Sequence, residues 1–283
     1  MKIDKPDPRI GAVVTDVDVR SLSDADWSRL YQTWLEGIVL VVRGQTLTIP
    51  EFLSYSARFG QLKPHRVKRT RHAEYPELTV MGIGTRKPDG QIDKTIYDRG
   101  GGWHTDSPWD TEICKATQLY GIEIPSYGGD TLFASMYEAW ETLPERLKQR
   151  LQGLKAEHVY GGRGRRGNDL LDPEDRNRPP AVHPIVRRHE ETGRISLYAN
   201  PYHIVRIQGL PEAESEALIA ALGPSTSTNA TRGQNVVFQT AALGGGADVI
   251  LSMPVRVAVP STSGSAAARP TSAPTISRRP RPS

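Results

Sequence analysis

Two side chains that can bind a metal stand two positions apart in the stretch GGWHTDSPWD, at His104 and Asp106. If this stretch is extended, alternate side chains point to the same face, so the imidazole and the carboxylate can bind one ion together. Such a pair supplies two of the three ligands in the facial triad of non-haem Fe(II) oxygenases, which leaves coordination positions open. A bare His-x-Asp also occurs in surface turns, so the rest of the chain has to distinguish a metal site from a turn.

The bulk composition is typical of a soluble globular protein. The 283 residues are 37% hydrophobic and 24% charged, and the basic surplus behind the net charge of +4 lies after Leu222, where six Arg accompany one Asp. No apolar run approaches the ~18–20 residues that span a bilayer, and the first residues lack the apolar core of a signal peptide. The single cysteine, Cys114, excludes an internal disulfide. We therefore expect a cytoplasmic location, with no membrane and no nucleic acid as partner.

Apolar patterns predict a series of strands and short helices that would position the His/Asp pair. Ser23 is expected to cap one helix, and Ser135 with Glu138 shows the capping-box pattern of another. The polar stretch 161–180 is expected to be a loop or lid. The predicted strands cover residues 11–19, 38–44, 78–84, 115–124, 154–161, 183–189 and 194–200, and the predicted helices cover 21–37, 48–60, 144–153 and 211–222.

The composition changes abruptly after Leu222, since residues 223–283 contain no His, Lys, Glu, Trp or Tyr. Short strands are compatible with the apolar stretches within 223–259, whose structure is otherwise uncertain. Residues 260–283 are rich in Ser, Pro and Arg and cannot bury enough apolar surface to offset chain entropy, so we expect disorder there. The sequence thus predicts one domain over residues 1–222, followed by these two segments.

Several stretches recur in one known family in the same order and at similar spacing: WHTD, ATQLYGIEIPSYGGDTLFASMYEAWETLP, LKAEH, HPIVRRHEETGRISLYAN and EAESEALIAAL. From about Ile10 to Leu222, the chain resembles the taurine dioxygenase (TauD/TfdA) family of Fe(II)/2-oxoglutarate-dependent dioxygenases. The resemblance implies an α+β fold with a mainly β core, a double-stranded β-helix or jelly roll with surrounding helices. Because the closing strands of that fold are not recognisable after Leu222, we expect it to be incomplete at the C-terminus.

The resemblance also implies roles for individual residues and two cofactors, Fe(II) and the co-substrate 2-oxoglutarate. His104 and Asp106 match the first two iron ligands, and Thr131 matches a threonine that hydrogen-bonds the far carboxylate of 2-oxoglutarate. The implied reaction consumes O2, releases succinate and CO2, and hydroxylates a carbon of a small-molecule substrate. The protein's share in such chemistry is to place that carbon and to exclude water. Dimers and tetramers are common in the family, so a homo-oligomer is compatible with the sequence.

The substrate-binding residues differ from those of the taurine enzymes. His65 matches a histidine that contacts substrate, but Gly100 falls where those enzymes have an asparagine, and His203 falls near one of their phenylalanines. A sulfonate, a sulfate ester or a carboxylate is a better prediction than taurine itself. The cationic side chains that could bind such an anion are Lys68, Arg163, Arg165 and Arg166, although the arginines also suit a solvated loop.

The family's third iron ligand and its 2-oxoglutarate-binding arginine are not recognisable, and no histidine follows His203. Two ligands hold Fe(II) more weakly than three, and the 2-oxoglutarate carboxylate loses a charged partner, so we expect little or no activity from this chain. A shifted reading frame from about residue 223 is one hypothesis for the change in composition, and the nucleotide sequence would test it. The alternative function is that of a non-catalytic jelly-roll protein that binds a small acid or a protein partner.

Overall fold

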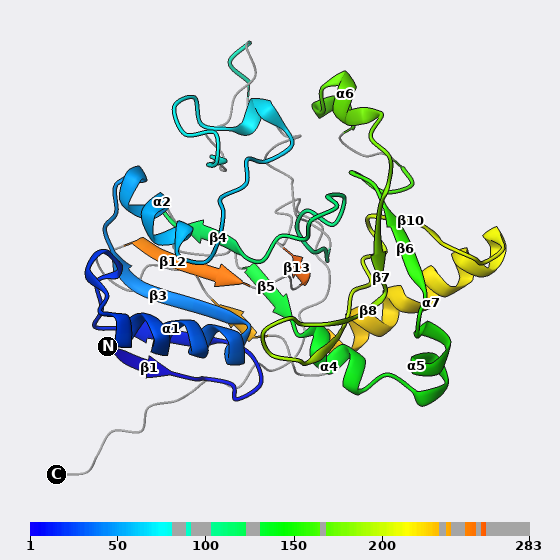
Figure 1. Cartoon of the computed structure of the whole chain (residues 1–283), viewed down its shortest axis with the longest axis horizontal. Coiled ribbons are helices and arrows are strands. Elements are labelled where there is room, and N and C mark those ends of the chain that lie inside the picture. Colours follow the sequence, from blue (N-terminus) through cyan, green and yellow to red (C-terminus); the bar gives the residue numbers. More distant parts are fainter. Residues whose placement is uncertain are drawn as a thin grey trace.

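The largest sheet of the molecule has five strands and combines distant parts of the chain. The computed structural model describes residues 1–80, 89–91, 103–122, 131–164, 168–231, 236–238, 247–252 and 256–258. Figure 1 shows the five-stranded sheet on one side of the molecule. Its strands are, in spatial order, β1 (Lys2–Asp4), β2 (Ala12–Thr15), β3 (Val39–Gln45), β12 (Ala247–Ser252) and β4 (Thr117–Tyr120).

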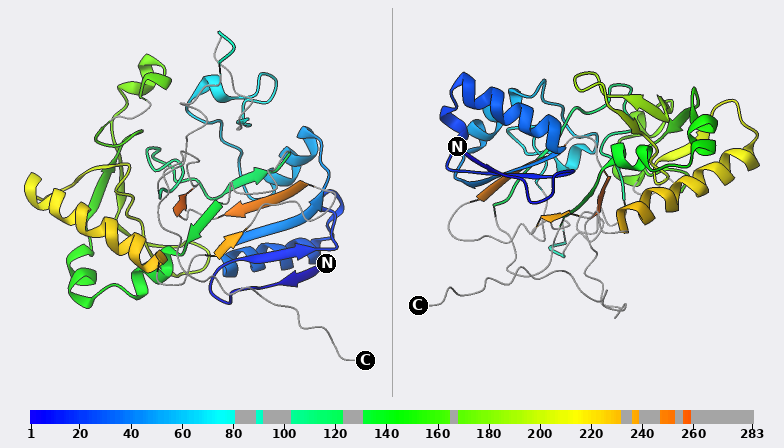
Figure 2. Two further views of the ribbon diagram at one scale, coloured as in Figure 1. Left: turned by 180° about the vertical axis from the view of Figure 1, so that it is seen from behind. Right: turned by 90° about the horizontal axis from the view of Figure 1, so that it is seen from below.

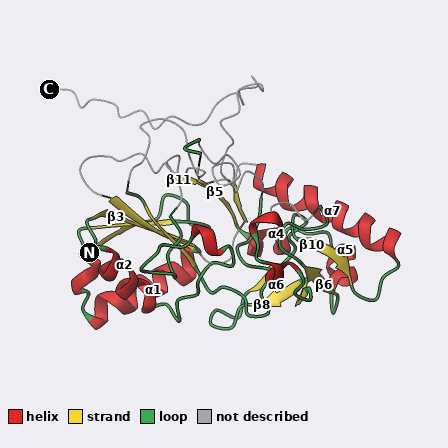
Figure 3. Ribbon diagram, turned by 90° about the horizontal axis from the view of Figure 1, so that it is seen from above, coloured by secondary structure: helices red, strands yellow, loops and turns green. Residues whose placement is uncertain are grey.

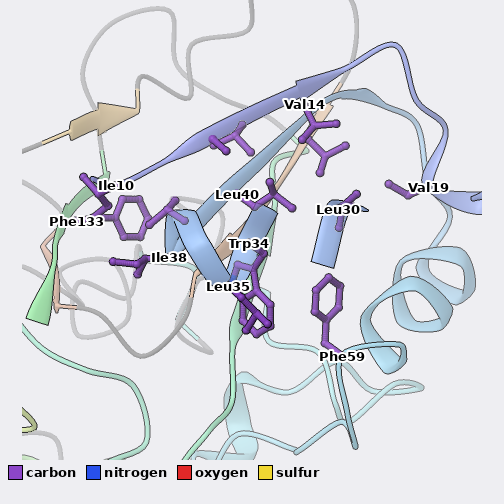
Figure 4. Packing of buried hydrophobic residues seen from close by; sticks show 14 of the residues in the cluster. Ile10, Val14, Val19, Leu30, Trp34, Leu35, Ile38, Leu40, Phe59 and Phe133 are labelled. Carbon is purple, nitrogen blue, oxygen red and sulfur yellow. The ribbon is translucent and has the colours of Figure 1, made fainter. Parts of the chain in front are cut away.

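Two helices cover one face of this sheet. Helix α1 (Asp24–Gly37) connects the parallel strands β2 and β3, and α2 (Ile49–Ala57) lies on the same side (Figure 3). Ser23 caps α1 by accepting a hydrogen bond from the backbone of Asp26, as the sequence predicts, and Thr48 caps α2 through a capping box. The two helices and β3 bury much of the hydrophobic core drawn in Figure 4, in which the side chain of Trp34 is fully buried.

A second group of elements lies on the other side of the molecule and builds a separate hydrophobic cluster. Its three-stranded sheet has β6 (Lys155–His158) at the centre, between β10 (Ile204–Ile207) and β7 (Ala181–Pro184). The hairpin of β8 (Val186–Arg188) and β9 (Ile195–Leu197) follows and corresponds to the strands predicted at 183–189 and 194–200. The helices of this group are α4 (Met136–Glu141), α5 (Glu145–Leu151) and α7 (Glu212–Thr231). Ser135 caps α4 as predicted.

Some elements differ from the sequence-based expectation. The stretch 161–180, expected to be a loop, contains the short helices η3 (Asn168–Leu170) and α6 (Pro173–Arg176), because Pro173 can open a helical turn at little cost. Most of the predicted strand 78–84 lies outside the described residues, and its beginning forms only an isolated bridge between Arg71 and Thr79. The remaining short elements are η1 (Val19–Ser21), η2 (Lys68–Thr70), β5 (Thr131–Ala134), β11 (Val236–Phe238) and β13 (Arg256–Ala258).

The segment after Leu222 contributes to the sheets. Strand β12 pairs antiparallel with both β3 and β4, and the view from behind in Figure 2 shows it between them. Strands β11 and β13 both pair with β5, so the short strands expected in 223–259 are present. Helix α7 continues past the boundary placed at Leu222 to Thr231, although this stretch begins with Gly223 and Pro224, which cost a helix interior about 1 and about 3 kcal/mol relative to Ala. The predicted tail 260–283 lies outside the described residues. Among the residues that the structure describes, no helix is long and apolar enough to cross a membrane.

Candidate metal and substrate site

The side chains of His104 and Asp106 lie on one face of their segment, as the predicted alternation requires. His104 Nε2 is 3.3 Å from Asp106 Oδ1, whereas Thr105 between them is buried. Two atoms that each bind one ion at about 2.1 Å, at right angles to one another, are about 3 Å apart. The pair is therefore spaced to share a metal ion.

The second carboxylate oxygen of Asp106 is held from the neighbouring strand. The hydroxyl of Thr117, the first residue of β4, donates to Asp106 Oδ2 over 2.8 Å, which leaves Oδ1 directed at His104. Desolvation raises the pKa of Asp106, but the hydrogen bond and charge of His104, the Thr117 hydroxyl and the charge of His65 outweigh it. The net pKa lies below its ordinary value, so the carboxylate is ionised and available as a ligand.

The segment that carries the pair is held by side chains from three distant parts of the chain. Asn200 Nδ2 donates to the Thr105 carbonyl over 3.3 Å. Arg66 Nη2 donates to the Trp109 carbonyl over 3.3 Å and forms an ion pair with the carboxylate of Asp110. His183, on β7, contacts the same turn through its Nε2 atom. Burial lowers the pKa of His183, and the carbonyls that it contacts oppose this shift only in part.

His203 lies near His104 and Asp106 and is almost fully buried, with 5% of its surface exposed. Its ring packs edge-to-face on that of Trp109, with centroids 4.8 Å apart. Burial, and then the charge of His104, lower the pKa of His203 to about 3. Its Nδ1 atom is buried and accepts no hydrogen bond from the described residues. His203 is therefore a neutral group with hydrogen-bonding capacity next to the pair.

His65 lies on a loop that is fixed by its own neighbours. Its Nδ1 atom accepts a hydrogen bond from the backbone of Val67 over 3.1 Å, and Arg71 Nε donates to its carbonyl over 2.6 Å. The loop is anchored where buried Val67 packs in one cluster with Leu170, Leu171 and Tyr160. The structure thus brings His65 and His203 to the neighbourhood of Asp106, because the charge of His65 contributes to the lowered pKa of Asp106 and the charge of Asp106 acts on the pKa of His203.

The basic residues expected to bind an anion are engaged elsewhere in the structure. Lys68 Nζ lies 2.6 Å from Asp172 and 2.9 Å from Glu174, and these carboxylates raise its pKa. Arg163 donates to the Val205 carbonyl and pairs with Glu216. Lys68 and Arg163, which the sequence offered as side chains that could bind an anion, are thus both paired with carboxylates from distant parts of the chain. Gly100, Arg165 and Arg166 lie outside the described residues.

The described residues place no third ligand beside His104 and Asp106. Within the described ranges, neither His65 nor His203 comes close enough to His104 and Asp106 to form a group of three ligands. The one such group in these ranges is acidic, Asp172, Glu174 and Asp175 near α6, and Lys68 already occupies it. Thr131, the residue expected to contact 2-oxoglutarate, is buried at the start of β5.

Comparison with known proteins identifies the family of this chain. Residues 2–227 match the taurine catabolism dioxygenase TauD, TfdA family. The chain belongs to this family. The resemblance seen in the sequence is thus confirmed, and with it the enzyme class of dioxygenases that depend on Fe(II) and 2-oxoglutarate.

Individual members of the TauD/TfdA family match most of the chain. The (S)-phenoxypropionate/alpha-ketoglutarate-dioxygenase of Sphingobium herbicidovorans is 32% identical over 232 residues, covering 76% of this chain and 76% of that protein. The alpha-ketoglutarate-dependent 2,4-dichlorophenoxyacetate dioxygenase of Cupriavidus pinatubonensis is 29% identical over 225 residues, covering 76% of this chain and 78% of that protein. Among solved structures, a taurine dioxygenase from Burkholderia xenovorans is 25% identical and superposes with a TM-score of 0.71, covering 92% of this chain and 82% of its own.

Several residues around His104 and Asp106 were not predicted from the sequence. Asn200 is 95 positions from the carbonyl that it binds, and His183 is 75 positions from one of its two carbonyls. Nothing in local spacing indicates such contacts. Arg66 and Trp109 lie beside predicted residues, but their role in the turn depends on tertiary packing.

Proposed function

We propose that this chain is an Fe(II)- and 2-oxoglutarate-dependent oxygenase that hydroxylates a small anionic organic substrate and releases succinate and CO2. The observation that carries this proposal is the 3.3 Å separation of His104 Nε2 and Asp106 Oδ1 within a family of such dioxygenases. In its finer details we propose a double-stranded β-helix core and a catalytic domain over residues 1–222. Residues 223–259 would then contribute short strands, and 260–283 would form a tail.

In this proposal His104 and Asp106 hold the Fe(II), and Thr131 hydrogen-bonds the far carboxylate of 2-oxoglutarate. Bound Fe(II) supplies open coordination positions at which 2-oxoglutarate and O2 can react. Thr117 keeps one Asp106 oxygen occupied, so the other would be the one available to a bound metal. The protein thereby fixes the ligand orientation before the metal binds, which reduces the ordering that binding requires.

The proposed substrate side combines neutral rings with one cationic side chain. His203 is neutral at physiological pH, so it would bind a substrate oxygen by hydrogen bonding rather than as a cation. The rings of His203 and Trp109 form an apolar wall that would exclude water from the reacting carbon. Arg71 brings a positive charge to the loop that carries His65. Gly100 is proposed as a further substrate-side position that leaves space for a larger molecule.

The substrate class follows from these groups and from the relatives. Two relatives are named for phenoxy acids, which are carboxylates, and one solved structure is a taurine dioxygenase, which acts on a sulfonate. Each of these compounds is a small acid. We propose a carboxylate, a sulfonate or a sulfate ester as substrate of this chain.

We further propose that turnover by this chain is low. Two protein ligands hold Fe(II) less tightly than three, and the described ranges offer no third ligand beside the pair. A measurement of succinate formed from 2-oxoglutarate by the purified chain, in Fe(II) and O2 with a panel of small acids, tests the function. Asp106→Ala should abolish whatever succinate forms. Succinate formation that is unchanged in Asp106→Ala would contradict the proposed site, and rapid turnover by the unaltered chain would contradict the proposed weakness.

A non-catalytic protein that binds a small acid is the second candidate, favoured by the absence of a third ligand from the described residues near the pair. Calorimetric titration separates the two functions. A catalyst should bind 2-oxoglutarate more tightly when Mn(II) is present, because the co-substrate would bind through the metal. A binding protein should take up its acid equally well with and without the metal.

A further inference from the structure

The backbone directly after Asp106 is in an unfavourable conformation. Ser107 has a φ of 51°, in the left-handed region that side-chain-bearing residues seldom adopt. Such a residue costs on the order of 1 kcal/mol and persists where surrounding contacts require it. Ser107 also starts a tight turn, in which the Asp110 amide donates to the Ser107 carbonyl over 3.1 Å and Pro108 takes the second position. The direction of the Asp106 carboxylate therefore depends on whatever holds this turn.

Two side chains bind three successive carbonyls of the turn. His183 Nε2 lies 3.0 Å from the Pro108 carbonyl and 2.9 Å from the Asp110 carbonyl. Arg66 Nη2 donates to the Trp109 carbonyl between them. A carbonyl can only accept, so the Nε2 atom of His183 has to carry the hydrogen and is shared by both acceptors. This requirement fixes the tautomer of a ring that is only 4% exposed.

We propose that His183 is a positioning residue for Asp106, which acts by holding the turn 107–110 in the conformation that directs the carboxylate at His104. The effect of His183 on metal binding rests on the proposed function, whereas its effect on the turn does not. His183 contacts neither ligand, so its effect passes through the backbone of the turn. Without its N–H, the carbonyls of Pro108 and Asp110 lose this donor, and Ser107 can relax to a negative φ. The peptide after Asp106 would then rotate, and the separation of 3.3 Å between the two ligand atoms would no longer be fixed.

Two variants of the full chain separate the hydrogen bond from the bulk of the ring. His183→Leu removes the N–H and keeps a similar apolar volume, whereas the amide nitrogen of His183→Gln can reach the position of Nε2. Mn(II) affinity measured by calorimetry should fall about tenfold in His183→Leu, the lower part of the range for groups that support metal ligands. His183→Gln should recover most of the loss. In the metal-free protein, hydrogen exchange of the Asp110 amide should be faster in His183→Leu than in the unaltered chain, and it should return toward normal in His183→Gln.

The control for general destabilisation is Ile185→Ala. Ile185 is fully buried two positions along the same stretch and belongs to the second hydrophobic cluster. This variant should melt at a lower temperature, because it removes buried apolar volume. Since Ile185 makes no hydrogen bond to the turn 107–110, the Mn(II) affinity should stay within about twofold of the unaltered chain, and the exchange rate of the Asp110 amide should not change.

Three results would overturn the inference: unchanged Asp110 exchange in His183→Leu, a His183→Gln variant as impaired as His183→Leu, or equal impairment in Ile185→Ala. If the unaltered chain binds no Mn(II), the proposed function fails. The exchange measurement then still decides the inference on the turn, because it needs no metal.

Discussion

Two regions of the molecule concentrate imidazole groups, and they differ in what surrounds each ring. In the ligand-bearing segment, the His104 side chain is 18% exposed and faces the carboxylate of Asp106. In the interior, the rings of His158, His183 and Tyr198 pack together with centroids 5.4 to 5.9 Å apart. Both imidazoles of this buried trio contact backbone carbonyls, Ala156 in the case of His158.

The difference shows that the group an imidazole contacts, a carboxylate or a backbone carbonyl, determines the role that the imidazole can have. An imidazole beside an ionised carboxylate at the edge of solvent can exchange this contact for a shared cation, since both groups are metal ligands. An imidazole whose N–H is bound to a buried carbonyl has no such alternative and is kept neutral by its surroundings. Of these three histidines, this contrast supports His104 as the proposed metal ligand, whereas His158 and His183 act through the carbonyls that they contact.

The largest effect on Mn(II) binding is expected from removing the partly exposed imidazole of His104. His104→Ala should weaken Mn(II) binding by roughly several hundredfold, because a ligand in a well-formed protein site contributes some 3–4 kcal/mol. The melting temperature should change little, since the side chain is partly exposed. Calorimetric titration and thermal melting give the two values.

A matched control is His189→Ala, in the turn between β8 and β9, where the ring accepts hydrogen bonds from the backbone of Glu191 and Thr192. This variant should keep its Mn(II) affinity. Equal affinities in His104→Ala and the unaltered chain would mean that the pair is not the metal site.

The buried imidazole of His158 makes the stability of the protein depend on pH. Burial, and then the charge of His183, lower the pKa of His158 to about 4, against 6.5 for an ordinary histidine. Between these values the unfolded chain binds a proton that the folded chain does not, so stability falls as the pH falls. The loss attributable to His158 between pH 7.5 and pH 5 should be about 2 kcal/mol.

Urea unfolding at the two pH values measures this loss. His158→Asn, whose amide can still donate to the Ala156 carbonyl, should be less stable at pH 7.5 but should show a pH dependence smaller by about that amount. If the pH dependence of His158→Asn matches that of the unaltered chain, protonation of His158 does not control it.

The smallest effect is expected at the third member of the buried trio. The Tyr198 hydroxyl is buried and has no hydrogen-bond partner among the described residues. Deleting an unsatisfied polar group is close to neutral, so Tyr198→Phe should change the free energy of unfolding by less than about 1 kcal/mol and in the stabilising direction. Thermal melting tests this, and a loss of about 2 kcal/mol or more would reveal a bound water or another partner of the hydroxyl.

The sequence predicted the features that depend on neighbours along the chain. The caps at Ser23 and Ser135 involve residues three positions apart, and the same-face arrangement of His104 and Asp106 follows from strand geometry. The family was recognisable because its motifs are local and ordered. Its ligand and substrate assignments remain proposals for the experiments above.

Contacts between distant residues escaped prediction. Lys68 was expected to bind an anion from solvent, but one of its carboxylate partners lies 106 positions away. His183 had no local pattern to connect it with the turn after Asp106. Strand β10 is short and follows the loop at His203, and its pairing with β6 exists only once the chain has folded back.

The central place of β12 has a consequence for the order in which the molecule can form. Strand β3 is almost wholly buried, yet one of its two sheet neighbours is made roughly 200 residues later, which at ribosomal rates of about 5–20 residues per second takes about 10–40 s. During that interval the nascent chain carries the apolar edge Val39–Val42 without its partner. Such a long-range pairing slows folding and leaves the growing chain open to association with other chains. Production of this protein should therefore be sensitive to chaperone supply and to translation speed.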